Sequence, residues 1–268
     1  MEYTIGEVSE LLALSRDMIR YYEKQGAIKS SRNNANNYRY YDDMEFFWLL
    51  EAMQHKSWGI PINEISGIRN NKYSYNTEQF LREEAARLRE ESAYKQVLAQ
   101  HLELIRRYML LGLQNIGNFW VDQIQAEYRC YLVRGYGDTY EKISMPSETS
   151  QFIFSDRNLP FFDSGLTIGE DYVDWEMTIN ERYLGILNGS LPDTFYKVPE
   201  CLCLCTHVDI GEIGQFDLKV FDTIKEYAQS HGYQAVPGAK TRGILLGRGY
   251  EDGKFHRIVQ VRMPVIRK

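Results

Sequence analysis

The sequence is poor in cysteine and has no long apolar run. Cysteine occupies four of 268 positions, and residues 110–129 contain neither cysteine nor histidine. No apolar run approaches the roughly 18 residues that span a membrane. The first residues also lack the basic start and apolar stretch of a signal peptide. We therefore expect a globular cytoplasmic protein whose thiols stay reduced.

A positive net charge is also lacking, which at first argues against nucleic-acid binding. The formal net charge is −6. Residues 16–39, however, contain six basic side chains and only two acidic ones. Because salt screens charges more than roughly 10 Å apart, a local basic surface can bind phosphate on an acidic protein. Composition therefore leaves DNA binding open without establishing it.

The first 30 residues predict two short helices joined by a tight turn. Thr4-Ile5-Gly6-Glu7 has the pattern of a capping box, which begins a helix that ends near Leu12. Ser15 is a good N-cap for a second helix over residues 16–24, and Gly26 suits the end of that helix. This spacing is typical of a helix-turn-helix.

A small hairpin and two further helices are predicted next. Residues 30–37 are rich in turn formers, and Tyr38-Arg39-Tyr40-Tyr41 has strand propensity, which together predict a wing. Asp42 caps a third helix that Gly59 ends, and Pro61 suits the first turn of a fourth helix reaching about Ile68. We expect residues 1–75 to form a winged helix-turn-helix domain.

The second helix and the wing hold the residue types that read DNA. Arg16 and Arg20 lie four residues apart on one helical face, and arginine can give two hydrogen bonds to a phosphate or a guanine edge. Alternation along the wing leaves open an inward-facing Tyr40, and ordinary surface or core packing is the alternative for the whole set. The predicted DNA-binding residues are Ser15, Arg16, Arg20, Tyr21, Tyr22, Tyr38, Arg39, Tyr41 and Lys56.

A long helix is predicted from about Thr77 to Asn115, where proline is absent and Gly112 is the first glycine. Apolar residues recur there every seven positions, as in a coiled coil. We interpret residues 76–118 as a dimerising coiled coil, because no adjacent segment is long enough to cover the helix; a helix packed on its own domain is the alternative. The seam comprises Leu81, Leu88, Lys95, Leu102 and Met109, with Leu98 and Ile105 at its second position.

These features together resemble the MerR family of transcription regulators. The resemblance covers residues 3 to about 115, through Ile5-Gly6-Glu7, Arg20-Tyr21-Tyr22-Glu23, the Tyr38–Tyr41 wing and the helix after Thr77. Asn37 stands where the family usually has glycine, and Met18 where threonine is common. The resemblance implies a homodimer, with no enzymatic activity and no cofactor. It would distort double-stranded promoter DNA so that RNA polymerase holoenzyme can use it, and would thus be an activator.

Residues 119–268 alternate strand signals with turns and predict an α+β domain with an antiparallel sheet. The helix is predicted over residues 216–230, where Phe216, Val220, Ile224 and Tyr227 form an apolar stripe. The fold class is thus mixed, with a helical N-terminal half and an α+β C-terminal half. The candidate strands are residues 129–134, 172–179, 183–187, 201–208, 241–246 and 257–263.

This domain is rich in aromatic rings and carboxylates, which suit a hydrophobic or cationic small molecule. It resembles the GyrI-like effector domain of the multidrug-sensing MerR proteins. Gln260 and Ile244 stand near positions where that fold usually carries a buried glutamate, so we look for a carboxylate on residues 171–176 instead. Strict alternation puts Asp174 and Glu176 on one face and Trp175 on the other. The predicted ligand-binding residues are Tyr128, Tyr136, Phe162, Tyr172, Asp174, Trp175, Glu176, Tyr183 and Gln260.

Three cysteines leave a second kind of sensor open. Cys201, Cys203 and Cys205 alternate along one predicted strand, so their thiols share a face about 6–7 Å apart. They form either a small-residue core face or a site for a soft metal or a thiol redox reaction. We favour the core face and predict no metal site. An enzyme is the third hypothesis, but the sequence has no nucleophile–base motif.

Overall fold

The computed structural model describes residues 1–32, 38–69, 75–251 and 253–267. Asn37, at the turn of the predicted wing, lies outside these ranges. Contacts divide the chain into two compact units, Met1–Ala93 and Tyr94–Lys268, with the boundary inside helix α5 (Tyr75–Gly112). Among the described residues, no helix is long and apolar enough to cross a membrane.

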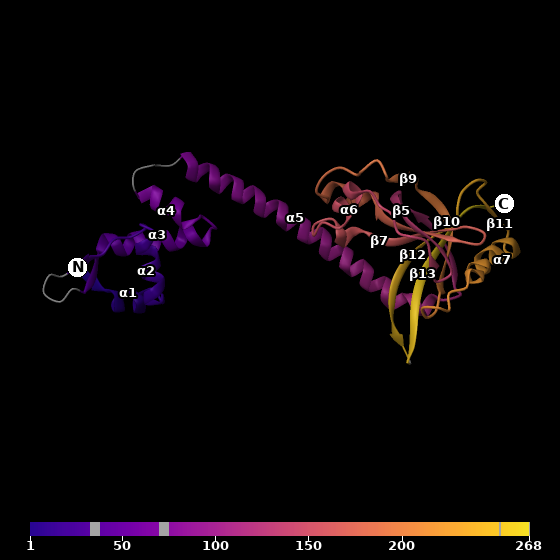
Figure 1. The fold of residues 1–268 in the computed structure, drawn as a ribbon, viewed down its shortest axis with the longest axis horizontal. Helices are drawn as coiled ribbons and strands as arrows, with labels where there is room; N and C mark the ends of the chain where they lie inside the picture. Colours follow the sequence, from indigo (N-terminus) through magenta and orange to yellow (C-terminus); the bar gives the residue numbers. More distant parts are fainter. Residues whose placement is uncertain (33–37, 70–74, 252, 268) are drawn as a thin grey trace. The chain divides into compact units, whose positions relative to one another are not determined.

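The first unit is the predicted winged helix-turn-helix (Figure 1). Its caps form as expected: the Thr4 capping box begins α1, and the Ser15 side chain accepts from the Met18 amide at the start of α2. A three-stranded antiparallel sheet has the order β1-β3-β2. The elements are β1 (Glu2–Thr4), α1 (Ile5–Leu11), α2 (Arg16–Lys24), β2 (Ser31–Arg32), β3 (Arg39–Asp42), α3 (Asp43–Ser57) and α4 (Ile62–Arg69).

One apolar core holds the first unit together. Ile19, Tyr41 and Leu49 are almost fully buried in it, and they come from α2, β3 and α3. Leu81, near the start of α5, packs against the same core. The first residue of the predicted coiled-coil seam is therefore partly covered by its own unit.

The second unit is built on an antiparallel sheet with the order β4-β10-β13-β12-β7-β8-β5-β6, to which β9 adds on β5 and β11 on β13. This confirms the predicted antiparallel α+β domain. The strands are β4 (Phe119–Ile124), β5 (Glu127–Tyr136), β6 (Thr139–Tyr140), β7 (Asp163–Ile168), β8 (Val173–Asn180), β9 (Tyr196–Val198), β10 (Cys201–Asp209), β11 (Tyr233–Ala235), β12 (Arg242–Glu251) and β13 (Lys254–Arg267).

Two predictions for this unit were wrong. Residues 183–187 do not form a strand: a 3-10 helix spans Glu181–Ile186, begun by the Asn180 side chain, which accepts from the Arg182 amide. The predicted helix over 216–230 is shorter, because Asp217 starts a 3-10 turn at Leu218–Phe221 and α7 covers only Asp222–Ser230. The remaining helices are α6 (Ser147–Ile153) and the 3-10 turns Leu113–Asn115 and Leu159–Phe161.

The two faces of the sheet differ in chemistry. One face is apolar and packs on α7, with Leu166, Val259 and Ile224 fully buried. The opposite face buries polar side chains, among them Arg129 and Glu176. The second half of α5 packs beside this polar face, because Tyr108 contacts the cluster of Ile244, Leu246 and Ile258.

This packing corrects the interpretation of the long helix. We expected nothing to cover it, but Leu98 packs with the core around Phe161, and Ile105 lines a cavity of the second unit. The two residues at the second seam position therefore pack within their own chain. Leu88, Leu102 and Met109, which stand seven residues apart or a multiple of seven, stay more than half exposed.

Candidate functional sites

The exposed side of α2 presents two arginines and a tyrosine. Arg16, Arg20 and Tyr21 are exposed, while Ile19 and Tyr22 of the same helix are buried. The Arg20 guanidinium pairs with Asp17 at 3.0 Å, but both side chains are more than half exposed. An ion pair so accessible to solvent is weak. The Arg20 guanidinium can therefore exchange Asp17 for a phosphate at little cost.

Glu23 fixes the wing to α2. Its carboxylate accepts from Ser30 Oγ at 2.5 Å, pairs with Arg39 Nε at 3.1 Å, and accepts from Tyr41 Oη at 3.4 Å. Burial, together with the nearby Glu23 charge, raises the pKa of Tyr41 to about 12. Glu23, near the end of α2, thus holds β3 in place.

Two predicted DNA-binding tyrosines are core residues instead. Tyr22 and Tyr41 are 3% and 1% exposed, so their rings do not reach a surface that DNA could contact. Tyr41 pairs with Tyr3 across β1 and β3, which turns its side chain into the core. The strand therefore turns Tyr41 inward. Tyr40, for which the sequence left an inward position open, is half-buried.

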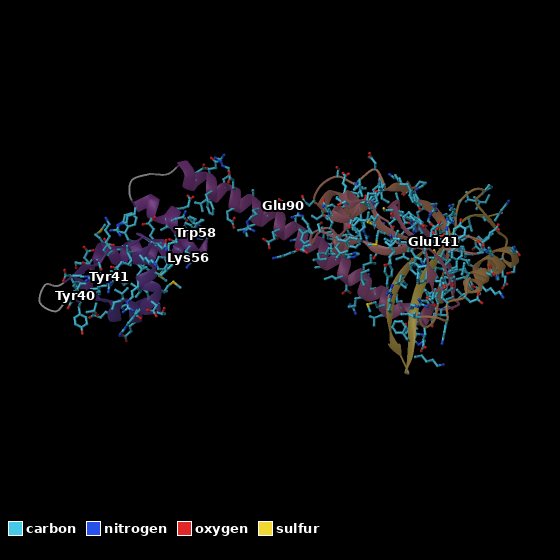
Figure 2. The ribbon with its side chains drawn as sticks, in the orientation of Figure 1. Tyr40, Tyr41, Lys56, Trp58, Glu90 and Glu141 are labelled. Carbon is cyan, nitrogen blue, oxygen red and sulfur yellow. The ribbon has the colours of Figure 1, made fainter. Side chains whose placement is uncertain are left out.

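Lys56 joins the exposed residues of α2 from another helix. Its ammonium lies 5.4 Å from the centroid of the Tyr21 ring and 5.5 Å from that of Tyr22. Figure 2 shows Lys56 on the same unit as the wing tyrosines Tyr40 and Tyr41. Six of the predicted residues are exposed in this unit: Ser15, Arg16, Arg20, Tyr21, Tyr38 and Lys56.

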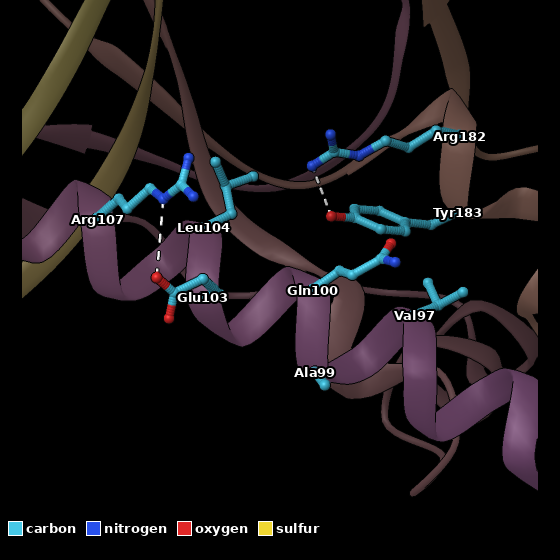
Figure 3. A pocket seen from close by; sticks show the side chains of 8 residues that line it. All are labelled: Val97, Ala99, Gln100, Glu103, Leu104, Arg107, Arg182 and Tyr183. Carbon is cyan, nitrogen blue, oxygen red and sulfur yellow. Dashed lines mark hydrogen bonds and ion pairs between the residues drawn. The ribbon is translucent and has the colours of Figure 1, made fainter.

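The second unit contains a groove beside α5. Its volume is about 710 Å³, and Val97, Gln100 and Leu104 of α5 line one side of it. Arg182 and Tyr183 face them from the 3-10 helix that follows β8 (Figure 3). The groove adjoins a smaller inner cavity of about 60 Å³, which shares Leu104, Arg182 and Tyr183.

Tyr183 stands at the junction of groove and cavity. Its hydroxyl accepts from Arg182 Nη2 at 2.6 Å and lies 2.9 Å from His101 Nδ1. His101 is 4% exposed, and burial lowers its pKa. The lowered pKa favours the neutral imidazole of His101. This imidazole can share a proton with the Tyr183 hydroxyl. Through this contact the sheet unit is fastened to α5.

A belt of buried charges lies on the polar face of the sheet. Arg129, with no exposed surface, pairs with Glu127 at 2.7 Å and with Glu176 at 2.8 Å. Arg262 donates to the Gln260 side chain at 2.6 and 2.8 Å and to Glu127 at 3.4 Å. Buried charges need such partners, because unpaired they lose the solvation of water. These groups are therefore mutually satisfied.

Two polar groups on the cavity wall have no such partner. Asp163 and Thr178 line the inner cavity and are direct cross-strand neighbours on β7 and β8. Thr178 Oγ1 is buried without a hydrogen bond. Within the described ranges, no hydrogen bond is formed by the Asp163 carboxylate. Burial raises its pKa to about 6, against the opposing effect of Arg262.

Comparison with known proteins identifies the first unit. Residues 4–41, which run from the cap of α1 through α2 to β3, match the family model described as "MerR family regulatory protein". Over this segment the chain is similar to MerR family regulatory proteins.

Curated relatives match only part of this chain. It is 22% identical over 143 residues to the HTH-type transcriptional regulator SkgA of Caulobacter vibrioides, covering 51% of the chain and 54% of SkgA. It is 29% identical over 108 residues to the multidrug-efflux transporter 1 regulator of Bacillus subtilis, covering 40% and 38%. The chain thus spans about half or less of the length of these curated relatives.

Solved structures give weaker likenesses. A cryo-EM structure of EcmrR with DNA covers 99% of the chain and 100% of its own, at 15% identity and a TM-score of 0.34. A hydrolase from Listeria innocua covers 57% of the chain and 93% of its own, at 11% identity and a TM-score of 0.33. At these values neither likeness identifies a function.

The structure does not bring the predicted ligand-binding residues together. Tyr183 lines the groove and cavity, but Trp175 and Phe162 belong to two separate apolar clusters. β8 pairs with β7 without a bulge, so its two faces stay separate as strict alternation requires. The Glu176 carboxylate accepts from Arg129, and the Gln260 side chain accepts from Arg262.

The other predicted residues have local partners. Asp174 pairs with Arg134 at 2.7 Å, and the same guanidinium lies 3.7 Å above the Tyr172 ring. Tyr128 packs beside the cluster that contains Phe162. Tyr136 is exposed and donates to Glu141, which Figure 2 labels, at 3.3 Å. None of these four side chains lines the groove or the inner cavity.

The cysteines are placed as a core face. Cys201 Sγ and Cys203 Sγ lie 3.4 Å apart, and Cys203 and Cys205 are buried. Burial raises the pKa of Cys203 well above its usual range and that of Cys205 to about 12. Thiols that stay protonated are poor nucleophiles and metal ligands. In the described part of the chain, no group of three or more histidine, cysteine, aspartate or glutamate side chains could hold a metal ion.

Sequence reasoning missed Asp163, Thr178, Arg262 and His101. His101 lies on a helix that was expected to dimerise along a seam that does not include residue 101, so its burial within its own chain had no sequence signal. Asp163 begins β7, a strand that was not predicted at all. The alternation of Thr178 with Asp174 and Glu176 was the one available pointer, because all three lie on the same face of β8.

The raised pKa of Asp163 predicts how the stability of the protein depends on pH. Its carboxyl group titrates near 6 when folded, against an ordinary value of 3.8, so ionisation costs stability above about pH 6, and that cost vanishes below about pH 4. We expect D163N to melt higher than wild type at pH 7.5, by on the order of 3 °C, and the two to converge near pH 4.

Differential scanning calorimetry at both pH values measures this effect. The control is D171N, since Asp171 is exposed and lies just before β8. This variant should match wild type throughout. A D163N protein that melts below wild type at pH 7.5 would show that the Asp163 carboxylate stabilises the fold.

Proposed function

We propose that this protein is a MerR-type transcription regulator that binds double-stranded promoter DNA as a homodimer and responds to a hydrophobic or cationic small molecule. The observation that carries DNA binding is the exposed face of α2. There Arg16, Arg20 and Tyr21 lie together, with Lys56 beside them. Arginine and lysine contacts to phosphate supply most sequence-independent affinity, and arginine in the major groove can read guanine.

The exposed stripe on α5 supports a homodimer. Leu88, Leu102 and Met109 repeat at multiples of seven residues, which is the period of a coiled-coil seam, and each is more than half exposed. A second copy of the chain presents the same stripe, so the interface is self-complementary. Dimerisation also suits a pseudo-palindromic promoter, whose two half-sites require two recognition helices.

The groove and the inner cavity support small-molecule sensing. They offer apolar walls from α5, the ring of Tyr183 and a few convergent polar groups, which is the usual make-up of a ligand site. The relative from Bacillus subtilis is named as the regulator of a multidrug-efflux transporter, which agrees with this proposal.

One helix provides a route from ligand to DNA. His101, Leu104 and Tyr108 of α5 line the cavity, and Phe80 and Leu81 of the same helix pack on the core of the first unit. A ligand that prefers one position of α5 would shift the population of conformations that hold the DNA. In that state RNA polymerase holoenzyme could use the distorted promoter, which makes the protein an activator.

DNA binding is tested by the double variant R16A/R20A. On a duplex selected from a random library by the wild-type protein, we expect affinity to fall on the order of 100-fold. The slope of log affinity against log salt should fall by about two if both arginines contact phosphate. Fluorescence anisotropy over a salt series measures both quantities.

The control is R106A, which removes an exposed arginine of α5 that pairs with Glu103. This change also removes an arginine charge, but it does not alter α2. We expect it to leave the affinity for DNA and the salt slope nearly unchanged. Equal losses in R106A and the double variant would point to general charge attraction. Unchanged binding by R16A/R20A would refute the α2 interface.

A further inference from the structure

We propose that Asp163 and Thr178 make the inner cavity selective for a protonated amine that retains N–H groups, as opposed to a quaternary cation or a neutral molecule. This inference rests on the proposed small-molecule function and names its ligand class. The two side chains are cross-strand neighbours at the start of β7 and near the end of β8, and both line the cavity. Side chains opposite each other on adjacent strands can contact one ligand atom together.

Neither of the two side chains forms a hydrogen bond with another described residue. Thr178 is 1% exposed, and its hydroxyl has no hydrogen-bond partner. A buried hydroxyl without a partner costs about 1–3 kcal/mol, so such groups are uncommon unless something else satisfies them. Asp163, on the neighbouring strand, is without a hydrogen bond to any part of the chain that the structure describes. The cavity therefore presents an acceptor pair that lacks a donor.

The nearby cationic side chains already have hydrogen-bond acceptors of their own. Arg129 is held by Glu127 and Glu176, and Arg262 donates to Gln260 and Glu127. Arg182 donates to the Tyr183 hydroxyl. Arg262 and Arg182 attract the Asp163 charge through space, but neither forms a hydrogen bond with it. A ligand donor would not have to displace an existing ion pair.

The chemistry of the pair defines the donor. A protonated primary or secondary amine has at least two N–H groups, so it can donate one to the Asp163 carboxylate and one to Thr178 Oγ1. Charged hydrogen bonds of this kind are roughly twice as strong as neutral ones. A quaternary ammonium or phosphonium ion has no donor and would leave Thr178 unsatisfied. Neutral molecules would bring no positive charge into direct contact with the carboxylate.

The dimensions also fit a small head group with an apolar tail. The inner cavity of about 60 Å³ accommodates an ammonium group, whereas the adjoining groove of about 710 Å³ offers Val97 and Leu104 to the remainder. Tyr183 lines both spaces and His101 lines the inner cavity, so an aromatic or alkyl stem passes beside their rings. An amine bound in this way contacts α5 directly.

The experiment compares matched ligands on the full-length protein by isothermal titration calorimetry. The panel contains arylalkyl primary amines, from phenethylamine to naphthylethylamine, their N,N,N-trimethyl derivatives, and the corresponding neutral alcohols. We expect at least one primary amine to bind about tenfold or more tightly than both its quaternary and its alcohol counterparts. T178V should reduce this preference, and D163N should abolish it, whereas D171N should retain it.

The outcomes separate this inference from the proposed function. Tighter binding of quaternary ions, or of alcohols, would overturn the inference while leaving a small-molecule sensor in place. A preference for amines that D163N does not change would also overturn it. Failure of every compound to bind would count against both. T178V keeps the shape of threonine without its hydroxyl, so it distinguishes loss of the hydrogen bond from loss of the fold.

Discussion

Replacement of Arg129 by alanine is expected to lower the free energy of unfolding of the sheet unit by about 3–5 kcal/mol, the range measured when one partner of a buried ion pair is removed. Arg129 is entirely buried and joins two strands by charge: Glu127 lies on its own strand, and Glu176 on β8. It also donates to the carbonyl oxygens of Leu166 and Gly243 at 3.1 and 3.4 Å. Alanine would leave a buried carboxylate without its main counter-charge.

Urea unfolding followed by circular dichroism measures the loss. R134A is the matched control, because Arg134 also pairs with a β8 carboxylate, Asp174, but its side chain is about one-third exposed. We expect this control to cost about 1 kcal/mol or less. R129K keeps the charge but not the forked donors, so it should fall between R129A and wild type. An R129A protein as stable as R134A would show that Glu176 does not depend on Arg129.

The second large effect concerns the α5 stripe. The double variant L102E/M109E is expected to sediment as a monomer at micromolar concentrations, because dimerisation would bury two carboxylates from each copy in an apolar seam. The same variant should bind DNA weakly, since one recognition helix alone contacts only one half-site. Analytical ultracentrifugation and anisotropy measure the two results.

L110E is the control for the stripe. Leu110 is also more than half exposed but lies one residue beyond the seven-residue repeat, so a charge there should leave the dimer intact. Dimers of L102E/M109E that persist at wild-type affinity would exclude this face as the interface. Dissociation caused by L110E as well would indicate a wider contact than a coiled-coil seam.

The sequence predicted the first unit closely, because its signals are local. The Thr4 capping box, the Ser15 cap and the Asp42 cap each concern side chains three residues from the amide that they accept from, and all three form. The prediction for the wing was wrong at one point. Which tyrosine turns inward depends on how β3 pairs with β1, a contact between residues 36 to 40 positions apart in sequence, and alternation alone does not determine it.

The candidate ligand site could be predicted far less well. Aromatic and acidic residues are frequent around β8, but their frequency does not reveal which face of the strand they occupy or which partner takes up each charge. Arg129 and Arg134 take up Glu176 and Asp174, the two carboxylates on which the prediction depended. Asp163 was overlooked because no local pattern marks it. That its carboxylate has no hydrogen-bond partner among the described residues can be seen only in the folded chain.

By itself the sequence determined the winged helix-turn-helix, the exposed arginines of α2, the long helix and the antiparallel class of the second unit. All of these depend on caps, turns and periodicity within short stretches. Only the tertiary structure decided that half of α5 packs beside the polar face of the sheet, and that Asp163 and Thr178 face the same cavity. Those facts depend on contacts between segments up to about 150 residues apart, whose pairing is determined by the packing of the whole unit.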